Sequence, residues 1–178
     1  MYELLILDVD GVLTTGKKYY DLNGNTIMKT FNDRDFTAIK QFMCSGLNVI
    51  FLSGDQQVNQ QVAEKRCIPF FYSRRDSGKL SKAECAEEIF KIFNVEKKNV
   101  IFVGDDLFDI EMRNFADFMA CPSNSHYLMK KSSDLILNSN SGEGCIQELF
   151  EYFVNKKLIN EPSIEKVIGR DSSEQVKY

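Results

Sequence analysis

The sequence predicts an α/β fold in which a parallel sheet is covered on both faces by helices. Short apolar runs of the kind that form buried strands alternate along the chain with segments whose apolar residues recur at helical spacing. Strands joined through helices are connected by right-handed crossovers, so they run parallel and are buried on both faces. The length of 178 residues fits one domain with one core.

The expected elements follow one another in a regular order. The first strand is the apolar run at residues 4–7, which ends at Asp8, and a later one at residues 100–103 ends before Gly104 and Asp105. The remaining strands are expected at residues 47–52, 70–72, 118–121 and 135–137. Helical patterns lie near residues 35–45, 56–66, 82–94, 107–115 and 143–156.

One segment breaks the alternation. Residues 18–31 carry two β-rich stretches around Asn23 and Gly24, a pair that is typical of a tight hairpin turn. This insertion follows the first strand directly, where a cap over a site would be placed, but it is too short to be a cap domain. We expect one domain over residues 1–158, with the hairpin at about residues 17–31, and a polar C-terminal tail at residues 159–178.

Composition argues against some classes of partner. The formal net charge is −4, which disfavours nucleic acid because phosphate backbones recruit basic faces. The five cysteines are scattered without metal-binding spacing, which is typical of buried thiols in a reducing compartment. The apolar run at the N-terminus is far shorter than the roughly 20 residues of a membrane span. We expect a cytoplasmic protein with no membrane partner.

Acidic residues follow the ends of separate predicted strands. Asp8 and Asp10 follow the first strand and Ser53 follows the second. A third group follows the strand at residues 100–103 and consists of Asp105, Asp106 and Asp109. Open parallel sheets bind ligands along their carboxyl edge, where such loops converge. Carboxylates that meet there repel one another without a cation, and oxygen ligands favour Mg²⁺. A single acidic loop is usually solvated surface, but the recurrence of acidic residues after two separate strands favours a metal site.

This set of residues fits phosphoryl transfer. Asp8 can attack phosphorus as a nucleophile and form an aspartyl phosphate, and Asp10 lies two residues away as a general acid and base. Ser53 offers a hydroxyl and the amides of a helix start to the phosphoryl oxygens, and Lys82 offers a cation. Lys79 lies near the same helix start and is the alternative to Lys82.

Together these motifs resemble those of the haloacid dehalogenase superfamily of phosphatases, which has a Rossmann-like fold. The four motifs are Asp8-Val9-Asp10-Gly11-Val12, Ser53-Gly54, Lys82 and Gly104-Asp105-Asp106-Leu107-Phe108-Asp109. They occur in order and cover most of residues 4–155. The resemblance implies that Asp8 is the nucleophile and Asp10 the acid and base. It also implies that Mg²⁺ is held by Asp8, the backbone carbonyl of Asp10 and Asp105, with Asp109 in support.

A closer resemblance is to the capless branch of this superfamily that hydrolyses 3-deoxy-octulosonate 8-phosphate and nonulosonate 9-phosphates. It rests on DVDGVLTTG at residues 8–16 with the hairpin after it, FNDRD at residues 31–35, VGDDLFD at residues 103–109 and a Gly-rich turn at residues 141–144. Members of this branch are tetramers in which the hairpins form a barrel and a neighbour helps cover each active site. The resemblance therefore implies a homotetramer that acts on a small sugar-acid phosphate.

Two residues depart from the octulosonate pattern. Those enzymes carry Arg after the glycine of the second motif and Arg in the Gly-rich turn, where this chain has Asp55 and Glu143. Arg pairs with a substrate carboxylate through two parallel hydrogen bonds, which an acidic residue cannot do. The acidic residues are more similar to nonulosonate phosphatases related to sialic-acid synthesis. We expect Gly54, Asp55, Arg34 and Glu143 to contact the substrate.

Other interpretations accompany this prediction. A receiver-like phospho-acceptor has a similar acidic pocket, but its phosphorylated aspartate follows the third strand and not the first. A second alternative is a catalytically weak oligomerisation or regulatory domain of nucleotide-sugar-acid synthesis, although all motif residues are present here. Arg34 and Asp35 fit an ion pair at a helix start equally well. The single histidine, His126, has no evident catalytic partner and is interpreted as structural.

Overall fold

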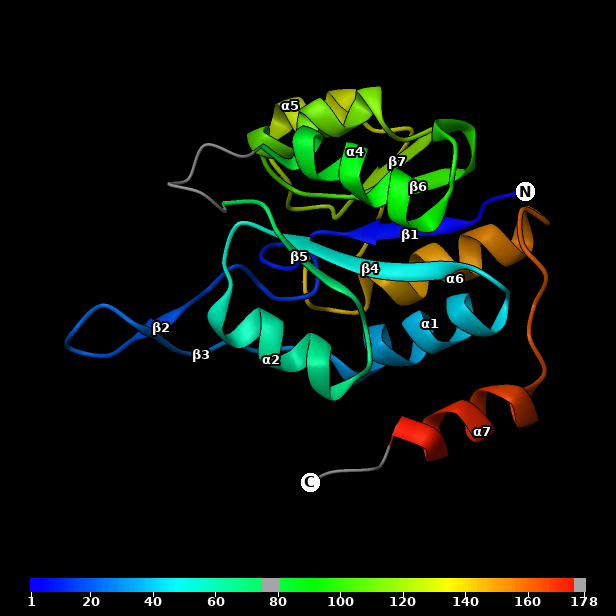
Figure 1. The fold of residues 1–178 in the computed structure, drawn as a ribbon, viewed down its shortest axis with the longest axis horizontal. Helices are drawn as coiled ribbons and strands as arrows, with labels where there is room; N and C mark the ends of the chain where they lie inside the picture. The colour runs from blue at the N-terminus through cyan, green and yellow to red at the C-terminus, as the bar shows by residue number, and fades with distance from the viewer. Residues whose placement is uncertain (75–80, 175–178) are drawn as a thin grey trace.

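The computed structural model describes residues 1–74 and 81–174, which form an α/β fold built on one six-stranded parallel sheet (Figure 1). The strands stand in the order β5-β4-β1-β6-β7-β8, and each neighbouring pair is parallel. Their bounds are β1 Leu4–Leu7, β4 Asn48–Ser53, β5 Phe70–Tyr72, β6 Val100–Val103, β7 Phe118–Cys121 and β8 Leu135–Ile136. The predicted fold class is therefore confirmed.

The central strand β1 is apolar throughout and is buried on both faces. All four of its residues are fully buried, and it pairs with β4 on one side and β6 on the other. The register places Leu7 beside Phe51 of β4 and Val103 of β6. The three strands thus end at one edge of the sheet, so Asp8 and Ser53 start from neighbouring positions at the ligand-binding edge.

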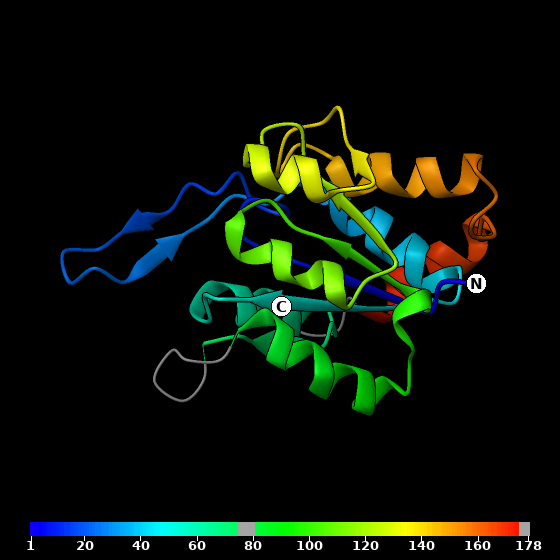
Figure 2. The same cartoon turned by 90° about the horizontal axis from the view of Figure 1, so that it is seen from above.

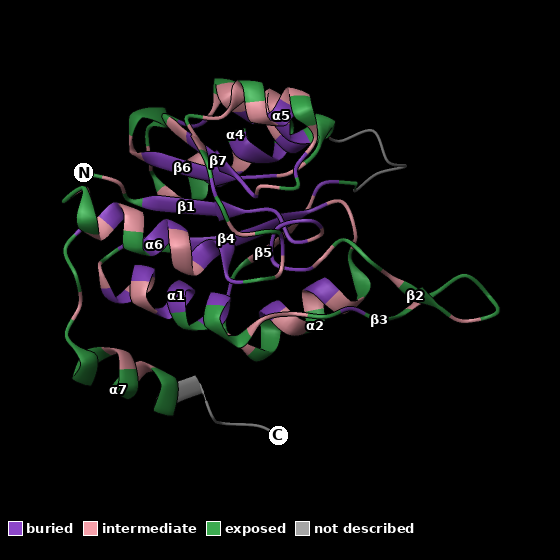
Figure 3. Cartoon of the chain, turned by 180° about the vertical axis from the view of Figure 1, so that it is seen from behind, coloured by how far each residue is buried: buried purple, intermediate pink, exposed green. Residues whose placement is uncertain are grey.

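Two layers of helices cover the two faces of the sheet (Figures 1 and 2). One layer consists of α1 (Asp33–Cys44), α2 (Gln57–Lys65) and α6 (Cys145–Asn155). The other consists of α4 (Lys82–Phe93), the 3-10 helix η2 (Leu107–Asn114) and α5 (Tyr127–Ser132). Alternate residues of β1 serve the two layers, since Leu5 and Leu7 pack with the first and Leu4 and Ile6 with the second. Figure 3 shows the buried residues gathered in the strands and along the inner sides of the helices.

Several helices differ from the sequence-based expectation. The predicted helix near residues 107–115 is the 3-10 helix η2, and α5 was not predicted. Part of the expected polar tail forms α7 (Ile164–Glu174), which lies beside α1. The Lys166 ammonium donates to the backbone carbonyl of Cys44, and Lys40 of α1 pairs with Asp171 of α7. These contacts with α1 hold the polar helix in place. A short 3-10 turn, η1 (Lys97–Asn99), leads into β6.

The hairpin after β1 projects from the body of the fold (Figures 1 and 2). Its strands, β2 (Tyr19–Tyr20) and β3 (Thr26–Met28), are antiparallel. The Asp21 carboxylate accepts hydrogen bonds from the backbone amides of Asn23 and Asn25, and Gly24 adopts a φ of +81°. Large apolar side chains are exposed along the hairpin, namely Tyr19, Tyr20, Leu22, Ile27 and Met28. Within the described residues no cap domain accompanies it. None of the helices in residues 1–74 and 81–174 has the length and hydropathy of a membrane span.

Candidate active site

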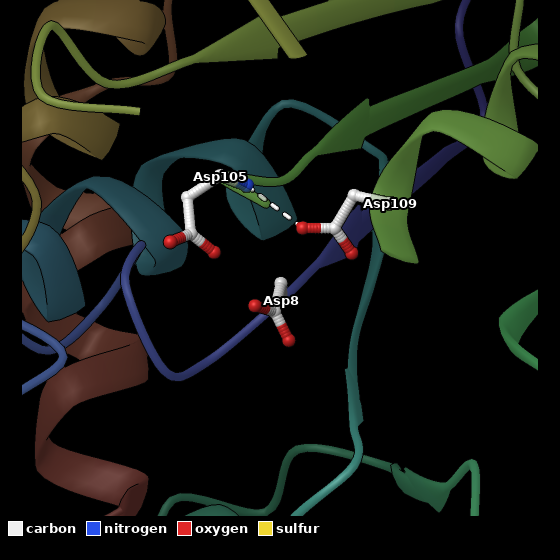
Figure 4. Close-up of side chains that lie close together, drawn as sticks. All are labelled: Asp8, Asp105 and Asp109. Atoms are coloured by element: carbon white, nitrogen blue, oxygen red, sulfur yellow. Dashed lines mark hydrogen bonds between the residues drawn. The ribbon is translucent and has the colours of Figure 1, made fainter. Parts of the chain in front are cut away.

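Three carboxylates meet at the carboxyl edge of the sheet. Asp8 follows β1, Asp105 follows β6, and Asp109 lies in η2. One oxygen of each lies within 4.8 Å of an oxygen of both others, and Figure 4 shows the three side chains turned toward a common space. Asp109 is fixed in this orientation because its Oδ2 accepts hydrogen bonds from the backbone amides of Asp105, at 2.8 Å, and Asp106, at 3.1 Å.

Two glycines make room for this cluster. A Cβ on Gly11 would lie 2.0 Å from Oδ2 of Asp105, and Gly11 has a φ of +89°, which side chains other than glycine rarely adopt. A Cβ on Gly104 would lie 2.6 Å from the Asp109 side chain. The glycines of the first and fourth motifs are therefore needed so that Asp105 and Asp109 can reach Asp8.

The charge in the cluster is unbalanced. Burial raises the pKa of Asp105, and the neighbouring charges of Asp8 and Asp109 raise it further. Burial also raises the pKa of Asp8, although the nearby Lys82 opposes that rise. Burial lowers the pKa of Lys82, but Asp109 and Asp8 outweigh this effect and leave its pKa above the usual value. Lys82 thus stays charged, and it offsets only part of the negative charge.

These residues fit a hard divalent cation. All three donor groups are carboxylates, and two of them, Asp8 and Asp109, are buried. Converging oxygen ligands of like charge are the arrangement that Mg²⁺ and similar ions stabilise. The carboxylate of Asp10 is not part of this cluster and lies 2.8 Å from the Lys29 ammonium. Metal binding by the backbone carbonyl of Asp10, which the family resemblance implies, stays a prediction.

Lys82 is placed against the cluster by the start of α4. Ser81 caps this helix, since its hydroxyl accepts a hydrogen bond from the backbone amide of Glu84 and the Glu84 carboxylate accepts one from the Ser81 amide. The Lys82 ammonium lies 2.8 Å from Oδ1 of Asp8 and pairs with Oδ1 of Asp109. The alternative, Lys79, lies outside the described residues.

The Asp10 side chain points into a separate group of polar residues. Its carboxylate lies 2.8 Å from the ammonium of Lys29 and 3.4 Å from that of Lys18. The Nδ2 of Asn59, in α2, donates to its Oδ2 at 3.0 Å. Asp8 and Asp10 therefore face different surroundings, although only one residue separates them.

Asp55 belongs to this second group. Its Oδ2 accepts hydrogen bonds from Lys18 at 2.7 Å and from Lys29 at 2.9 Å. Burial alone would raise the pKa of Asp55, but the hydrogen bonds and charges of Lys18 and Lys29 outweigh it and hold the pKa below its ordinary value. Ser53 adjoins the group, because its hydroxyl accepts hydrogen bonds from the Asp55 amide at 3.1 Å and from Asn59 at 3.0 Å.

A cleft of about 1260 Å³ joins the two groups. Most of the predicted site residues line it: Asp8, Asp10, Ser53, Gly54, Asp55, Lys82, Asp105 and Asp109. The hairpin contributes Lys18 and Tyr20 to its wall. Arg74, which follows β5, also lines the cleft, and its guanidinium lies so close to Gly54 that a Cβ on that glycine would be 3.0 Å from Nε.

The other two predicted substrate-binding residues lie outside the described lining of this cleft. Arg34 is exposed on α1, where its backbone amide donates to the side chain of Asn32. Glu143 is exposed in the Gly-rich turn and accepts a hydrogen bond from Asn140. Their predicted contact with substrate stays a prediction.

Two polar residues considered in the sequence have structural contacts. The buried carboxylate of Asp35 accepts hydrogen bonds from the backbone amides of Gly144, Ile146 and Gln147. These amides lie at the start of α6 and have no acceptor within the helix itself. His126 precedes α5, and its Nδ1 accepts a hydrogen bond from the amide of Leu128. Both side chains therefore cap helices.

Sequence reasoning missed Lys18, Lys29, Asn59 and Arg74. Lys18 and Lys29 lie near the two ends of the predicted hairpin, which is the one available signal for them. Asn59 stands among glutamines in a helix whose polar residues suggest a solvated face, and nothing in its spacing indicates burial. Arg74 follows a three-residue strand and resembles any basic loop residue.

Comparison with known proteins agrees with this geometry. A family model described as haloacid dehalogenase-like hydrolase matches residues 77–149. The chain is 30% identical over 149 residues to the 3-deoxy-D-manno-octulosonate 8-phosphate phosphatase KdsC of Haemophilus influenzae, across 83% of this chain and 79% of that protein. The chain belongs to the haloacid dehalogenase-like hydrolase family. It is a phosphatase similar to KdsC, which is a phosphoric monoester hydrolase, and phosphatases of this family use a divalent metal.

Solved structures of this family share the fold. The cobalt-bound form of the Haemophilus influenzae octulosonate 8-phosphate phosphatase superposes with a TM-score of 0.78 at 28% identity, over 86% of this chain and 88% of that one. The Moraxella catarrhalis enzyme, in complex with a magnesium ion, a phosphate ion and a KDO molecule, has a TM-score of 0.76 at 22% identity, over 86% of each chain. The second likeness shows the fold alone. The predicted resemblance to the capless haloacid dehalogenase phosphatases is confirmed.

Proposed function

We propose that this phosphatase is Mg²⁺-dependent and hydrolyses a phosphorylated 3-deoxy-2-ulosonic acid through an aspartyl phosphate on Asp8. One observation carries the proposal. Asp8 is held between a buried cation, 2.8 Å away on Lys82, and two further carboxylates, while the carboxyl group of Asp10 is held apart from them in the same cleft. A nucleophile and a proton-transfer group thus have separate supports, as a two-step phosphatase requires.

The proposed reaction has two balanced steps. An oxygen of Asp8 forms a bond to phosphorus while the bond from phosphorus to the leaving oxygen breaks, and Asp10 gives that oxygen its proton, so the sugar departs as an alcohol. Asp10 then takes a proton from water as the water oxygen bonds to phosphorus and the bond between Asp8 and phosphorus breaks. Lys82 and the Ser53 hydroxyl donate hydrogen bonds to the phosphoryl oxygens. Mg²⁺ bound by Asp8, Asp105, Asp109 and the carbonyl of Asp10 would neutralise developing negative charge.

The substrate class is supported by the relatives and by charge in the cleft. Octulosonate 8-phosphate phosphatases are among the curated relatives of the chain, at about 30% identity. Asp55, which lines the cleft where the octulosonate enzymes carry arginine, favours a nonulosonate 9-phosphate over octulosonate 8-phosphate. Glu143 departs from arginine in the same way in the sequence, although it lies outside the described lining of the cleft. A substrate carboxylate still needs a cation, and Arg74, exposed at the cleft wall beside Gly54, supplies one.

We also propose a homotetramer assembled through the hairpin, in the cytoplasm. The exposed apolar side chains of the hairpin support the assembly, because burial of five such side chains against a neighbouring subunit would stabilise the complex. The five cysteines form no disulfide within the described residues, which supports a reducing compartment.

The test is a phosphate-release panel with Asp8→Asn as the key variant. Wild type is expected to hydrolyse octulosonate 8-phosphate and nonulosonate 9-phosphates with Mg²⁺, with a clear kcat/KM preference for one of them. Asp8→Asn is expected to fold normally and to lose nearly all turnover, whereas Asp33→Asn, a change at an exposed aspartate, keeps it. Full turnover by Asp8→Asn contradicts the mechanism. A stable phosphorylated Asp8 without turnover of esters would instead favour a phospho-acceptor.

A further inference from the structure

Lys29 is a buried lysine to which the proposed reaction gives no role. It follows β3 on the returning arm of the hairpin, and its side chain is 0% exposed. Its ammonium nitrogen lies 2.8 Å from Oδ1 and 2.9 Å from Oδ2 of Asp10, 2.9 Å from Oδ2 of Asp55 and 2.8 Å from Oδ1 of Asn59. An ammonium group has three N–H donors, so three acceptor side chains occupy all of them.

Asn59 contacts the same carboxylate from α2. It is fully buried, and its Nδ2 donates to Oδ2 of Asp10 at 3.0 Å and to the Ser53 hydroxyl at 3.0 Å. Because its Oδ1 accepts from Lys29, the amide has one satisfactory orientation, with the carbonyl toward the ammonium and the NH₂ toward the carboxylate. Two elements far apart in the sequence therefore fix one carboxyl group.

We propose that Lys29 and Asn59 are positioning residues that hold the carboxyl group of Asp10 at the leaving-group oxygen of the substrate. This inference rests on the proposed function, in which Asp10 transfers that proton. The Asp10 side chain is 18% exposed, so most of its surface is occupied by protein contacts and only a small part faces the cleft. A proton donor must lie within hydrogen-bond reach of its acceptor, and a displacement of about 1 Å can cost about 100-fold in rate.

Through Lys29, the hairpin contacts two carboxylates of the cleft. It contacts Asp10 and Asp55 with one ammonium group, so the charge of each carboxylate is opposed by a buried cation that the hairpin delivers. Asp55 therefore supports the positioning of Lys29, whatever contact it also makes with substrate. Removal of Lys29 would leave the carboxyl group of Asp10 with Asn59, the more distant Lys18 and a 3.5 Å contact from Thr14.

The experiment compares leaving groups. An aliphatic phosphate ester releases an alkoxide and needs the acid, whereas p-nitrophenyl phosphate releases a stable phenolate and does not. The parameter kcat/KM covers the steps up to departure of the leaving group, so the later role of Asp10 as a base does not enter. Lys29→Met and Asn59→Ala are expected to lower kcat/KM for the sugar phosphate by about 100-fold and for p-nitrophenyl phosphate by less than about 5-fold.

Asp10→Asn provides the reference pattern of selective loss. Lys17→Met is the matched control, because it removes an exposed lysine at the base of the same hairpin. Because Lys29→Met leaves two carboxylates without their buried cation, Lys29→Met/Asp55→Asn is the second variant, with the same selective loss expected. A uniform loss with both leaving groups, or no loss, in the folded variants overturns the positioning role while the proposed function stands. If Asp10→Asn itself shows no selective loss, or wild type releases no phosphate, both the proposed mechanism and this inference fail.

Discussion

Substitution of Gly11 by alanine tests whether the close approach of Asp105 to the first motif is needed for activity. An ordinary non-bonded contact is about 3.5 Å, and the added Cβ would lie 2.0 Å from Oδ2 of Asp105, so that carboxylate must retreat by about 1.5 Å. The clash is with the end of a flexible side chain and not with backbone, so the fold can absorb it. The proposed metal cluster cannot absorb a shift of that size, because its three donor oxygens all lie within 4.8 Å of one another.

Stability and activity are therefore expected to separate in Gly11→Ala. Alanine at a φ of +89° costs about 1–2 kcal/mol of backbone strain. Loss of outer contacts to a metal ligand typically costs 10–100-fold in affinity or activity, so displacement of a proposed ligand itself is expected to cost about 100-fold or more. Gly46→Ala is the matched control, because Gly46 has a φ of +102° with nothing within 4 Å of its added Cβ.

The assay pairs denaturant unfolding with steady-state kinetics and a Mg²⁺ titration. Both variants are expected to lose a similar unfolding free energy, while only Gly11→Ala loses kcat/KM and binds Mg²⁺ more weakly. If Gly11→Ala keeps kcat/KM within about threefold of wild type while folded, the argument that the glycine admits Asp105 to a working site is refuted.

Three further predictions follow from the described contacts. Removal of divalent ions with EDTA is expected to abolish phosphatase activity, and added Mg²⁺ is expected to restore it and raise Tm. Burial raises the pKa of Asp105 and the charges of Asp8 and Asp109 raise it further, and a bound cation would offset both effects. An Asp105→Asn variant with an undiminished Mg²⁺-dependent rise in Tm contradicts this. Asp35→Ala is expected to cost about 1–3 kcal/mol in urea unfolding, since it orphans the amides at the start of α6. Asp35→Asn, which keeps an acceptor, is expected to cost less, and an equal cost in both variants counts against the capping role. The folded pKa of Asp55 is below its ordinary value of 3.8, so its ionised form contributes stability above that pH and loses it as pH falls. Acid unfolding of Asp55→Asn is therefore expected to show a shallower fall in unfolding free energy below about pH 4, and an unchanged slope would refute the pairing with Lys18 and Lys29.

Most of the sheet could be predicted because its strands are apolar on both faces. The runs LLIL at β1 and VIFV at β6 are predicted to the residue, since no polar position interrupts them. The helix α7 could not be predicted, because its position depends on contacts such as that between Lys166 and the Cys44 carbonyl, which join residues far apart in the sequence. The pattern at residues 107–114 indicates a helix but does not distinguish an α-helix from a 3-10 helix.

The candidate site was predictable where strand ends determine it. Asp8 and Asp105 follow adjacent strands, so topology alone brings them together. The partners of Asp10 were not predictable, since no sequence pattern shows which lysine of a hairpin turns inward or that Asn59 is buried. Arg74 was missed for the same reason, because its place beside Gly54 depends on pairing between β4 and β5.

The two ends of the hairpin differ in how much redesign they tolerate. The outer part, residues 19–28, carries exposed side chains and a turn closed by its own aspartate, so the fold of one subunit would tolerate exchange there. Such an exchange would still change the proposed assembly surface and Tyr20 at the cleft wall. The inner part ends in Lys18 and Lys29, whose ammonium groups reach the carboxylates of the cleft. A graft that keeps the outer arm but moves these two lysines would preserve the outline of the molecule and lose the internal counter-charges of Asp10 and Asp55.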